Sequence, residues 1–370
     1  MTRLRPSGQS AIAVVGGGLI GLAVAWRLAQ RGWDVTLFEK STLANEASWA
    51  GAGMLAPGGE IAGPSEMATL AIQSRALYTS FVSELETASG LTIDYQECGA
   101  LDIAYSDREW SLLEARAQVQ SSLAITHRKL QPIQILTFWP RVRKEDLVGG
   151  IFYPGDGIVN PRELTSALSV ACNRVGVVSK ERCAVVTVGI SEGGALVQTQ
   201  QDRYRFAAAV ISAGSWSSLL PVTGVPPMPQ VGPIKGHLIG YDQPEQTCNT
   251  IVRHGHMYFL QRANGLLIAG ASVERAGFDR EIKPGVVADL VAKAGFVFPH
   301  LAETTPSQTW TGLRPESDRL QLGPWHSPYL YLAYGHYRNG ILLAPVTAER
   351  IAAAVNANLR MPQSASDERR

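Results

Sequence analysis

Apolar and polar positions follow a clear order near the N-terminus. Residues 11–15 form a short apolar run rich in β-branched side chains, which is typical of a buried parallel strand. Residues 19–30 then read as a helix that Gly32 closes, and residues 34–38 read as a second strand. This order predicts a strand–helix–strand unit at the start of the fold.

The turn after the first strand carries glycines with the GxGxxG spacing, at Gly16, Gly18 and Gly21. Gly16 allows a tight turn, Gly18 lets the backbone approach a pyrophosphate, and Gly21 lets the helix pack closely on the strand. The positive end of the helix would face the phosphates. Glu39 ends the second strand, where a carboxylate can accept hydrogen bonds from an adenosine ribose. Together these features predict a dinucleotide site.

A secretory signal peptide is the alternative interpretation of this region. Arg3 and Arg5 precede an apolar run whose small residues resemble a cleavage site. Cleavage near Ala23 or Ala25 would remove the glycines and leave Glu39 without a purpose. We therefore favour the dinucleotide site.

The pattern changes several times before residue 150. Residues 48–57, SWAGAGMLAP, are rich in glycine and alanine, and we expect their backbone to lie against a flat molecule. Residues 64–90 carry apolar side chains at helical spacing and predict a long amphipathic helix. Residues 91–105 resemble strands, and Asp107 is placed to cap a further helix.

After residue 150 the pattern becomes richer in strands. Asn160 is placed to cap a helix whose apolar face would carry Leu164, Leu168 and Val175. The other predicted elements are a strand and turn at 151–159, strands at 207–214, 235–241, 256–261 and 266–272, a helix at 286–294, another strand, and a strand, glycine turn and helix within 329–355.

The expected fold class is α/β, with α+β character overall. A Rossmann-like nucleotide-binding domain of discontinuous segments would hold an inserted substrate domain with a mixed or antiparallel sheet. The expected boundaries are 11–90, 150–222 and 315–356 for the nucleotide domain, 91–149 and 223–314 for the substrate domain, and 1–10 and 357–370 for the tails.

Composition excludes several classes of protein. The chain has 370 residues and a formal net charge of +1 without a basic run, which argues against a nucleic-acid partner. No 18-residue apolar span follows the first helix, so we expect no membrane segment and a cytoplasmic location. The seven histidines lack metal-binding spacing, and no CxxC pair occurs, so we expect neither a metal site nor a disulfide framework. The four cysteines are Cys98, Cys172, Cys183 and Cys248.

Six motifs follow one another along the chain in an order that resembles one protein family. They are GGGLIG with Glu39, SWAGAGMLAP, GDGIVNPREL, VISAGSW, TGLRP and GHYRNGILLAP. Their order and spacing resemble the FAD-dependent amine oxidases of the D-amino acid oxidase superfamily, above all the glycine oxidases linked to thiamine biosynthesis. The resemblance covers roughly residues 10–355. Residues 335–345 form its most specific motif.

The resemblance implies FAD as the cofactor. No cysteine lies near Arg314 or His336, where the related sarcosine oxidases tether their flavin, so we expect FAD to bind without a covalent bond. Besides Gly16, Gly18 and Gly21, the implied cofactor contacts are Leu19, Ile20, Glu39, Lys40, Ala47, Ser48, Ala52, Gly53, Met54, Val185, Gly214, His336, Tyr337, Arg338, Asn339, Gly340, Ile341 and Leu342.

Three residues match the substrate-binding side of the family. Arg314 lies at the end of a strand, before a proline that fixes the turn, and a planar guanidinium can hold a carboxylate with two parallel hydrogen bonds. Tyr258 matches a tyrosine that reaches the same carboxylate, and Arg338 matches a second arginine on the substrate side. An arginine more often makes a solvated surface ion pair, and Tyr258 alone would fit a plain core.

The reaction implied by the resemblance moves a hydride from the substrate Cα to flavin N5. It needs an uncharged amine and no side-chain base, so we assign no catalytic side chain, although His256 and His336 are alternatives as acid–base groups. The protein would then supply orientation and electrostatics. Reduced flavin would pass its electrons to O2 and give H2O2, and the imine would be released or hydrolysed.

Some departures from the family leave the substrate open. Residues 259–262 read FLQR where the family usually has a VPR-like sequence, Val273 replaces a frequent methionine, and residues 58–64, the expected cover of the site, match nothing informative. We expect glycine or an N-substituted glycine such as sarcosine as the small-molecule substrate, with O2 as co-substrate. A larger N-carboxymethyl or D-amino acid substrate is the alternative, and a homo-oligomer is expected from the relatives.

Two other function classes fit the sequence less well. A quinone-linked dehydrogenase should carry an amphipathic or basic segment that docks on a membrane, and the sequence has none. A nicotinamide enzyme or a noncatalytic nucleotide-binding subunit has no evident use for residues 335–345. We therefore favour the flavin oxidase.

Overall fold

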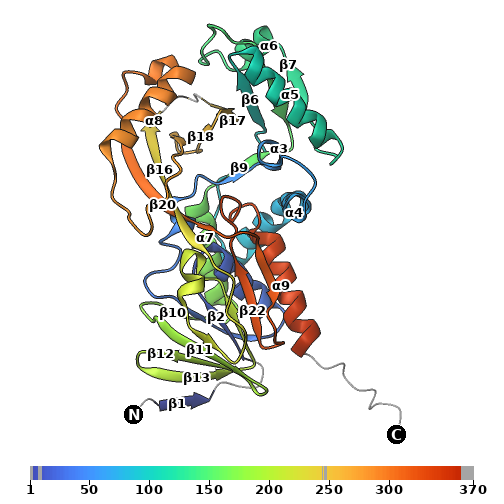
Figure 1. Ribbon diagram of the computed structural model, residues 1–370, viewed down its shortest axis with the longest axis vertical. Coiled ribbons are helices and arrows are strands. Elements are labelled where there is room, and N and C mark those ends of the chain that lie inside the picture. Colours follow the sequence, from blue (N-terminus) through green and yellow to red (C-terminus); the bar gives the residue numbers. More distant parts are fainter. Residues whose placement is uncertain (1–2, 7–10, 244, 246–247, 360–370) are drawn as a thin grey trace.

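The computed structural model describes residues 3–6, 11–243, 245 and 248–359. Its elements form two lobes stacked along the long axis of the molecule (Figure 1). The lower lobe contains a six-stranded and a five-stranded sheet, and the upper lobe contains an eight-stranded sheet. A small three-stranded sheet joins β4 (Met54–Leu55), β9 (Gly157–Val159) and β5 (Tyr95–Gln96) between the lobes.

The six-stranded sheet forms the centre of the lower lobe. All its pairings are parallel except the last, between β22 and β21. In spatial order its strands are β10 (Val178–Lys180), β3 (Asp34–Phe38), β2 (Ala11–Val15), β14 (Ala208–Ile211), β22 (Leu330–Tyr334) and β21 (Gln321–Pro324). The predicted strand–helix–strand unit is confirmed, because β2 and β3 pair in parallel and α1 (Leu19–Gln30) connects them.

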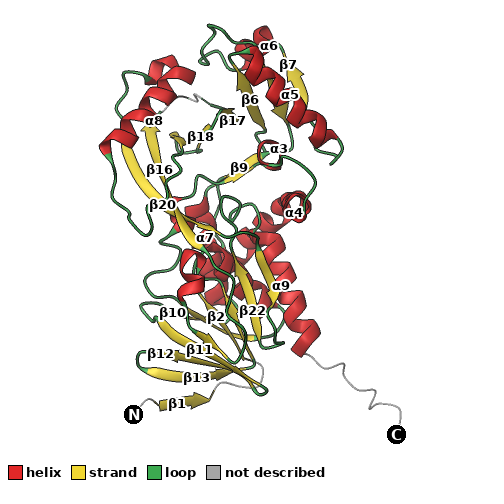
Figure 2. Ribbon diagram, viewed as in Figure 1, coloured by secondary structure: helices red, strands yellow, loops and turns green. Residues whose placement is uncertain are grey.

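Both faces of this sheet are covered, so its strands are apolar throughout. Ile12 and Val14 pack into one core with the helices, whereas Ala13 and Val15 pack into a second core with the five-stranded sheet. The helices of the first core are α1, α4 (Glu66–Ser89), α7 (Pro161–Arg174) and α9 (Ala344–Leu359). Figure 2 shows the resulting layers of helices and strands in the lower lobe.

The five-stranded sheet was not predicted from the sequence. Its strands, in spatial order, are β1 (Arg3–Pro6), β13 (Asp202–Phe206), β12 (Gly194–Thr199), β11 (Val185–Ser191) and β15 (Val222–Thr223). The residues of β1 were assigned to an N-terminal tail, but they pair in parallel with β13. This strand therefore depends on a distant partner and not on a local pattern.

The upper lobe holds the mixed sheet expected for the substrate domain. One pairing, between β17 and β6, is parallel, and the others are antiparallel. In spatial order the strands are β20 (Gln308–Glu316), β16 (Gly232–Asp242), β19 (Leu266–Gly270), β18 (Met257–Gln261), β17 (Ile251–His254), β6 (Ala100–Ala104), β8 (Gly149–Tyr153) and β7 (Arg128–Leu130). The boundary expected at residue 150 falls inside β8, which belongs to this sheet.

Helices cover one face of the upper sheet. A core cluster joins that face to α6 (Pro132–Phe138) and α8 (Pro284–Val297), and η2 (Pro299–Leu301) follows α8. The opposite face packs against Ala50, Ala52 and Ala56. Those residues belong to the segment that contains α2 (Ala47–Ala50), β4 and α3 (Pro57–Glu60). The predicted glycine- and alanine-rich segment thus lies between the lobes.

The predicted helices are largely confirmed, with one correction at a helix start and one at a helix end. Ser65 caps α4 and Gly90 ends it in the left-handed conformation. Helix α5 (Asp107–Ser121) is capped by Ser106 and not by Asp107, because the Ser106 hydroxyl accepts from the Glu109 N–H. Asn160 caps α7 as predicted, but Val175 follows the last turn and is 39% exposed, so it is not on the apolar face.

Candidate active site

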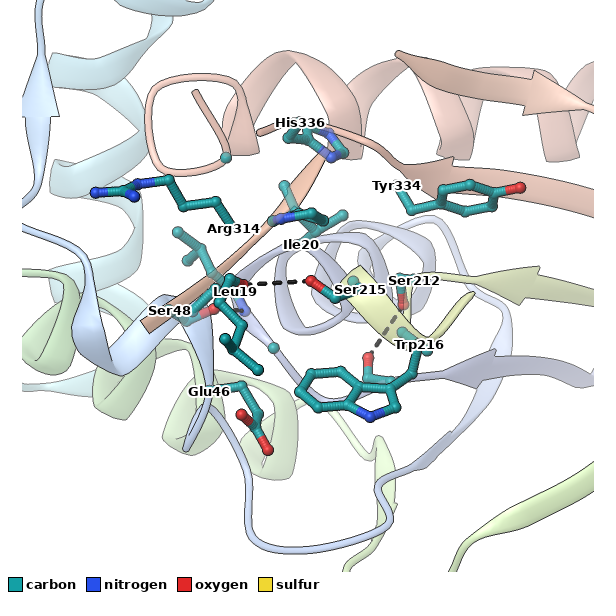
Figure 3. A pocket seen from close by; sticks show the side chains of 18 of the residues that line it. Leu19, Ile20, Glu46, Ser48, Ser212, Ser215, Trp216, Arg314, Tyr334 and His336 are labelled. Atoms are coloured by element: carbon teal, nitrogen blue, oxygen red, sulfur yellow. Dashed lines mark hydrogen bonds between the residues drawn. The ribbon is translucent and has the colours of Figure 1, made fainter. Parts of the chain in front are cut away.

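A cavity of about 420 Å³ lies where the two lobes meet (Figure 3). Its wall takes residues from the β2–α1 turn, the segment 44–54, the 3₁₀ helix η1 (Gly214–Leu219) and strands β16, β20 and β22. The predicted site residues that line it are Gly16, Gly18, Leu19, Ile20, Glu39, Lys40, Ala47, Ser48, Ala52, Gly53, Met54, Val185, Gly214, Tyr258, Arg314, His336, Tyr337, Arg338, Gly340 and Ile341.

Three predicted cofactor contacts lie outside this wall. Gly21 packs behind the turn, because a Cβ there would come within 1.9 Å of the Gly16 carbonyl oxygen. Leu342 belongs to the core shared with the helices. Asn339 accepts a backbone hydrogen bond from Leu343 and starts the turn into α9. The packing of the turn and of α9 places these three residues, and their contact with the cofactor stays a prediction.

The N-terminus of α1 faces the cavity with its main-chain N–H groups. Gly18 is the N-cap and has no side chain to offer, and the first turn, Leu-Ile-Gly-Leu, carries no charge. The Leu19 N–H donates to the Ser48 hydroxyl over 2.9 Å, and Figure 3 shows the two residues together. A helix start of this kind attracts an anion, so it fits the pyrophosphate of FAD.

The three glycines of the turn have different physical roles. Gly16 has φ +106°, and a Cβ there would lie 2.6 Å from the Ala213 Cα. Gly21 is equally constrained by the Gly16 carbonyl. At Gly18 the nearest atom to a Cβ would be the Ser48 hydroxyl at 3.2 Å. The fold therefore needs Gly16 and Gly21, whereas Gly18 leaves open the approach of a ligand.

Glu39 is held in one orientation by main-chain donors. Its Oε2 accepts from the Gly17 N–H and its Oε1 from the Ser41 N–H, each over 2.8 Å. A carboxylate has about four acceptor positions, so these bonds leave capacity for hydroxyl donors. The geometry fits the predicted contact with a ribose.

A cation and an aromatic ring face each other on the same wall. The Lys40 Nζ lies 3.4 Å from the centre of the Trp216 ring, and the Arg280 guanidinium lies 5.6 Å from that centre. Burial lowers the pKa of Lys40, which the nearby Glu46 partly offsets. Figure 3 shows Trp216 and Glu46 on one side of the cavity, with Tyr334 and His336 on the other.

Gly214 and Gly53 also differ in how much room a side chain would have. Gly214 has φ +54°, and among the described residues no atom lies within 4 Å of where its Cβ would be. Gly53 has φ +94°, and its Cβ would lie 1.9 Å from the Val159 carbonyl oxygen. The buried Arg262 fixes this segment by donating to the carbonyls of Ala52 and Val159. Gly214 thus faces open space, and Gly53 serves packing.

Arg314 lies on β20, and its side chain reaches the cavity by passing over Gly236 of the paired strand β16. Its Nη1 donates to the Ser272 carbonyl over 3.1 Å, and a Cβ on Gly236 would lie 2.2 Å from the same nitrogen. Burial lowers the pKa of Arg314. Within the part of the chain that the structure describes, no carboxylate forms an ion pair with it. A half-buried cation without an acidic partner is suited to a carboxylate ligand.

Tyr258 and Arg338 converge on the same end of the cavity. Tyr258 is buried, which raises the pKa of its hydroxyl, and the charges of Arg314, Arg338 and Glu60 are near enough to act on it. The Arg338 Nη2 donates to Glu60 Oε1 over 3.0 Å. The structure therefore brings the three predicted substrate residues together, and Arg338 already has an acidic partner from α3.

The two histidines differ in their positions. His336 is buried and pairs through Nε2 with the Thr347 hydroxyl over 3.0 Å, and burial lowers its pKa to about 3. His336 is therefore uncharged at neutral pH. His256 is exposed in the turn between β17 and β18 and does not line the cavity. Neither position is suited to general acid–base work at the cavity.

Sequence reasoning missed several residues of the wall. Ser215 and Trp216 lie in the VISAGSW motif and Leu313 lies in TGLRP, which offered a signal, whereas Gly236 lies outside the six motifs. These are some of the lining residues that were not predicted: Glu46, Ser212, Ser215, Trp216, Gly236, Leu313 and Tyr334.

The described residues contain neither a candidate metal site nor a membrane-spanning helix. No group of three or more His, Cys, Asp or Glu side chains there has a geometry that could hold a metal ion. No helix in the described ranges is both long enough and apolar enough to span a membrane.

Known proteins match most of the chain. The family described as FAD dependent oxidoreductase (DAO) matches residues 11–354. A glycine oxidase from Geobacillus kaustophilus is 32% identical over 92% of this chain and 91% of that protein. A bifunctional ThiO/ThiG protein from Nostoc is 35% identical over 92% of this chain, which spans 52% of that longer protein.

Solved structures agree with this assignment. The crystal structure of the glycine oxidase from Geobacillus kaustophilus has a TM-score of 0.88 and 30% identity, over 94% of both chains. That of a glycine oxidase from Bacillus cereus has a TM-score of 0.87 and 28% identity. The predicted fold, enzyme class and cofactor are thereby confirmed: the chain belongs to the DAO family of FAD-dependent oxidoreductases.

Proposed function

We propose that this enzyme oxidises glycine or a small N-substituted glycine, with O2 as electron acceptor and H2O2 as product. One observation carries the proposal. Arg314 is a half-buried cation at the cavity wall that bonds the Ser272 carbonyl and the Tyr258 hydroxyl, and among the described residues no carboxylate forms an ion pair with it. The relatives that are named glycine oxidases support the choice of substrate.

The residues at this end of the cavity would bind and orient the substrate. The planar guanidinium of Arg314 can hold both oxygens of a carboxylate, and the Tyr258 hydroxyl can donate to the same group. Bound FAD would accept the two electrons of the Cα–H bond. Fixing the carboxylate at Arg314 would set the position of the Cα atom that follows it.

The amine would have to enter the reaction uncharged. His336 is neutral and engaged with Thr347, so it has no proton-accepting role in this proposal. The chain would contribute binding, orientation and a water-poor wall, and the cofactor would contribute the redox chemistry.

A peroxide-coupled screen tests the proposal. Purified enzyme would be supplied with glycine, sarcosine, other N-alkyl glycines and small D-amino acids, and H2O2 would be measured alongside substrate loss. We expect the highest kcat/KM for glycine or a small N-alkyl glycine. Flavin that is bleached by glycine without air but makes no H2O2 in air would overturn O2 as acceptor. Flavin that neither glycine nor any small N-alkyl glycine bleaches would overturn the proposed substrate.

Three further expectations belong to this proposal. We propose a cytoplasmic enzyme, which the four free cysteines support. FAD should be released on denaturation, because Cys183, the cysteine in the cavity wall, lies next to Val185 and away from the substrate end. Homo-oligomer formation stays a prediction, which light scattering would measure.

A further inference from the structure

The short helix α3 is tied to the upper lobe by buried side chains. Asp156 accepts from the Gly58 N–H over 3.0 Å. Gln120 Nε2 donates to the carbonyls of Gly58 and Ile61. The side chains of Asp156 and Gln120 are 2% and 0% exposed, so water does not compete for these bonds.

Charged side chains extend the same network. Asp102 binds both Arg116 and Arg253, and Arg253 also reaches Asp156 over 3.4 Å. Arg116 Nη1 donates to the carbonyl of Gly59 over 3.1 Å. Two carboxylates and two guanidinium groups balance, so the charges of this network compensate one another.

The two glycines of α3 allow this network to lie against the backbone. A Cβ on Gly58 would lie 2.5 Å from Tyr153, and one on Gly59 would lie 1.9 Å from the Arg253 Cζ. Figure 1 shows α3 between α5 and α4, at the junction of the lobes. The segment is therefore seated on side chains of α5, β6, β17 and the turn after β8, and not merely laid across the opening.

The other side of α3 faces the cavity through one residue. Glu60, the last residue of α3, pairs with Arg338 over 3.0 Å, and Arg338 lines the cavity. The buried network fixes the backbone of α3, the backbone carries Glu60, and Glu60 holds Arg338. The position of α3 thus controls the position of a charged group at the substrate end.

We propose that Gln120, together with Asp156 and Arg116, positions α3 and thereby restricts the substrate end to small carboxylic acids. This inference rests on the proposed function for its substrate. Gln120 is a positioning residue, since it acts through the backbone of Gly58 and Ile61 and through Glu60. Loosening α3 should weaken the binding of glycine and relax the discrimination against larger N-alkyl glycines.

The first test uses Gln120→Met, which keeps the length of the side chain and removes both donor bonds. We expect KM for glycine to rise about fivefold with kcat within about twofold, as the loss of modest hydrogen bonds predicts. The kcat/KM ratio of N-ethylglycine to glycine should rise. Gln118→Met is the matched control, because Gln118 is exposed on the same helix. An unchanged KM and ratio in Gln120→Met would overturn the proposal.

A second variant disturbs the contact between α3 and the buried network by a change in α3 itself. Gly59→Ala removes no side chain of the network, but it places a methyl group 1.9 Å from the Arg253 Cζ, so α3 and Arg253 must move apart. The same change in KM and in the substrate ratio is expected. If Gln120→Met does not fold, this variant decides, and a wild-type KM in Gly59→Ala would overturn the proposal.

Hydrogen exchange separates this inference from the proposed function. The Gly58 amide should exchange about tenfold faster in Gln120→Met than in the wild-type holoenzyme. The variant loses the two hydrogen bonds from Gln120 to the carbonyls of Gly58 and Ile61, which hold the backbone of α3 in place. This readout needs no substrate. If no glycine derivative is oxidised but exchange rises as expected, the proposed function fails and the positioning of α3 stands. Unchanged exchange would refute the positioning role.

Discussion

The two ends of the cavity are built from different parts of the chain. The nucleotide end uses the main chain: the N–H groups at the start of α1, where the N-cap Gly18 has no side chain, and a turn in which Gly16 and Gly21 have no room for one. The substrate end uses side chains, with Tyr258 and Arg314 arriving from separate strands of the upper sheet. One end is specified within a short run of sequence, and the other exists only after distant strands have paired.

This difference predicts how each end responds to change. A main-chain site is lost when a side chain intrudes on the space of the ligand, since the donors themselves cannot be mutated away. A side-chain site is lost when one group is removed, since a buried charge then has no partner. Damage at the nucleotide end should therefore remove the cofactor, whereas damage at the substrate end should leave the cofactor in place.

The largest effect is expected at Gly18. Gly18→Leu should fold, because only the Ser48 hydroxyl at 3.2 Å is near the position of its Cβ. The larger side chain would fill the approach of the pyrophosphate, so we expect FAD affinity to fall at least ~1,000-fold and activity to vanish. Absorbance of the purified protein and titration with FAD measure this.

Gly21→Leu provides the contrast for that experiment. Its Cβ would lie 1.9 Å from the Gly16 carbonyl, so the protein itself should fail to fold. A Gly18→Leu protein that retains a full complement of FAD would show that the phosphates bind elsewhere.

The second prediction removes the cation of the substrate end. Arg314→Ala would leave the substrate carboxylate unmatched in a desolvated site, at a cost of roughly 3–5 kcal/mol. Because each 1.4 kcal/mol is about a factor of ten, kcat/KM should fall at least about a hundredfold. Steady-state kinetics with glycine measure the loss, and the flavin spectrum should stay near normal.

Lysine at this position sharpens the second prediction. Arg314→Lys should recover only part of the activity, because a point charge does not reproduce the two-pronged contact. An Arg314→Ala enzyme that keeps both its flavin and its activity would remove Arg314 from the substrate site.

The third prediction tests whether the space beside Arg314 matters. Gly236→Ala would place a Cβ 2.2 Å from the Arg314 Nη1 and push the guanidinium out of its position. We expect kcat/KM to fall about tenfold, mostly through KM, because the charge remains but its geometry is lost. Gly232→Ala on the same strand is the control, since among the described residues no atom lies within 4 Å of its Cβ. Equal kinetics for the two variants would contradict the prediction.

The same contrast explains how far the sequence alone could lead. The strand–helix–strand unit and the separate roles of Gly16 and Gly21 followed from neighbouring residues, because turn sterics are local. Arg314 and Tyr258 could be named only through the family resemblance. Their surroundings were not predictable, since Gly236 and the Ser272 carbonyl meet Arg314 only after the upper sheet has formed. The contribution of β1 was missed for the same reason.

Some individual positions show this limit as well. The resemblance to the family pointed to residues 335–345 as a whole, and the turn does reach the cavity with Tyr337 and Arg338. It did not distinguish residues that face inward from Leu342, which packs into the core. It also gave no hint that Arg338 would be paired with Glu60 of α3. Side-chain direction within a turn depends on the elements packed around it.

The smallest effect concerns His336, which lines the cavity and whose Nε2 pairs with the Thr347 hydroxyl. Burial lowers its pKa to about 3 from an ordinary 6.5. Between those values the unfolded chain binds the proton and the folded chain does not, so the free energy of unfolding falls as pH drops through this range. Between pH 7.5 and 6.0 the free energy of unfolding should fall by about 1 kcal/mol from this group.

His336→Gln lacks this titration, so its stability should decline less over the same interval. Urea unfolding of both proteins with saturating FAD measures the difference. Parallel declines would mean that His336 takes up its proton as readily in the folded enzyme as in the unfolded chain, so the fold does not hold it as a neutral partner of Thr347.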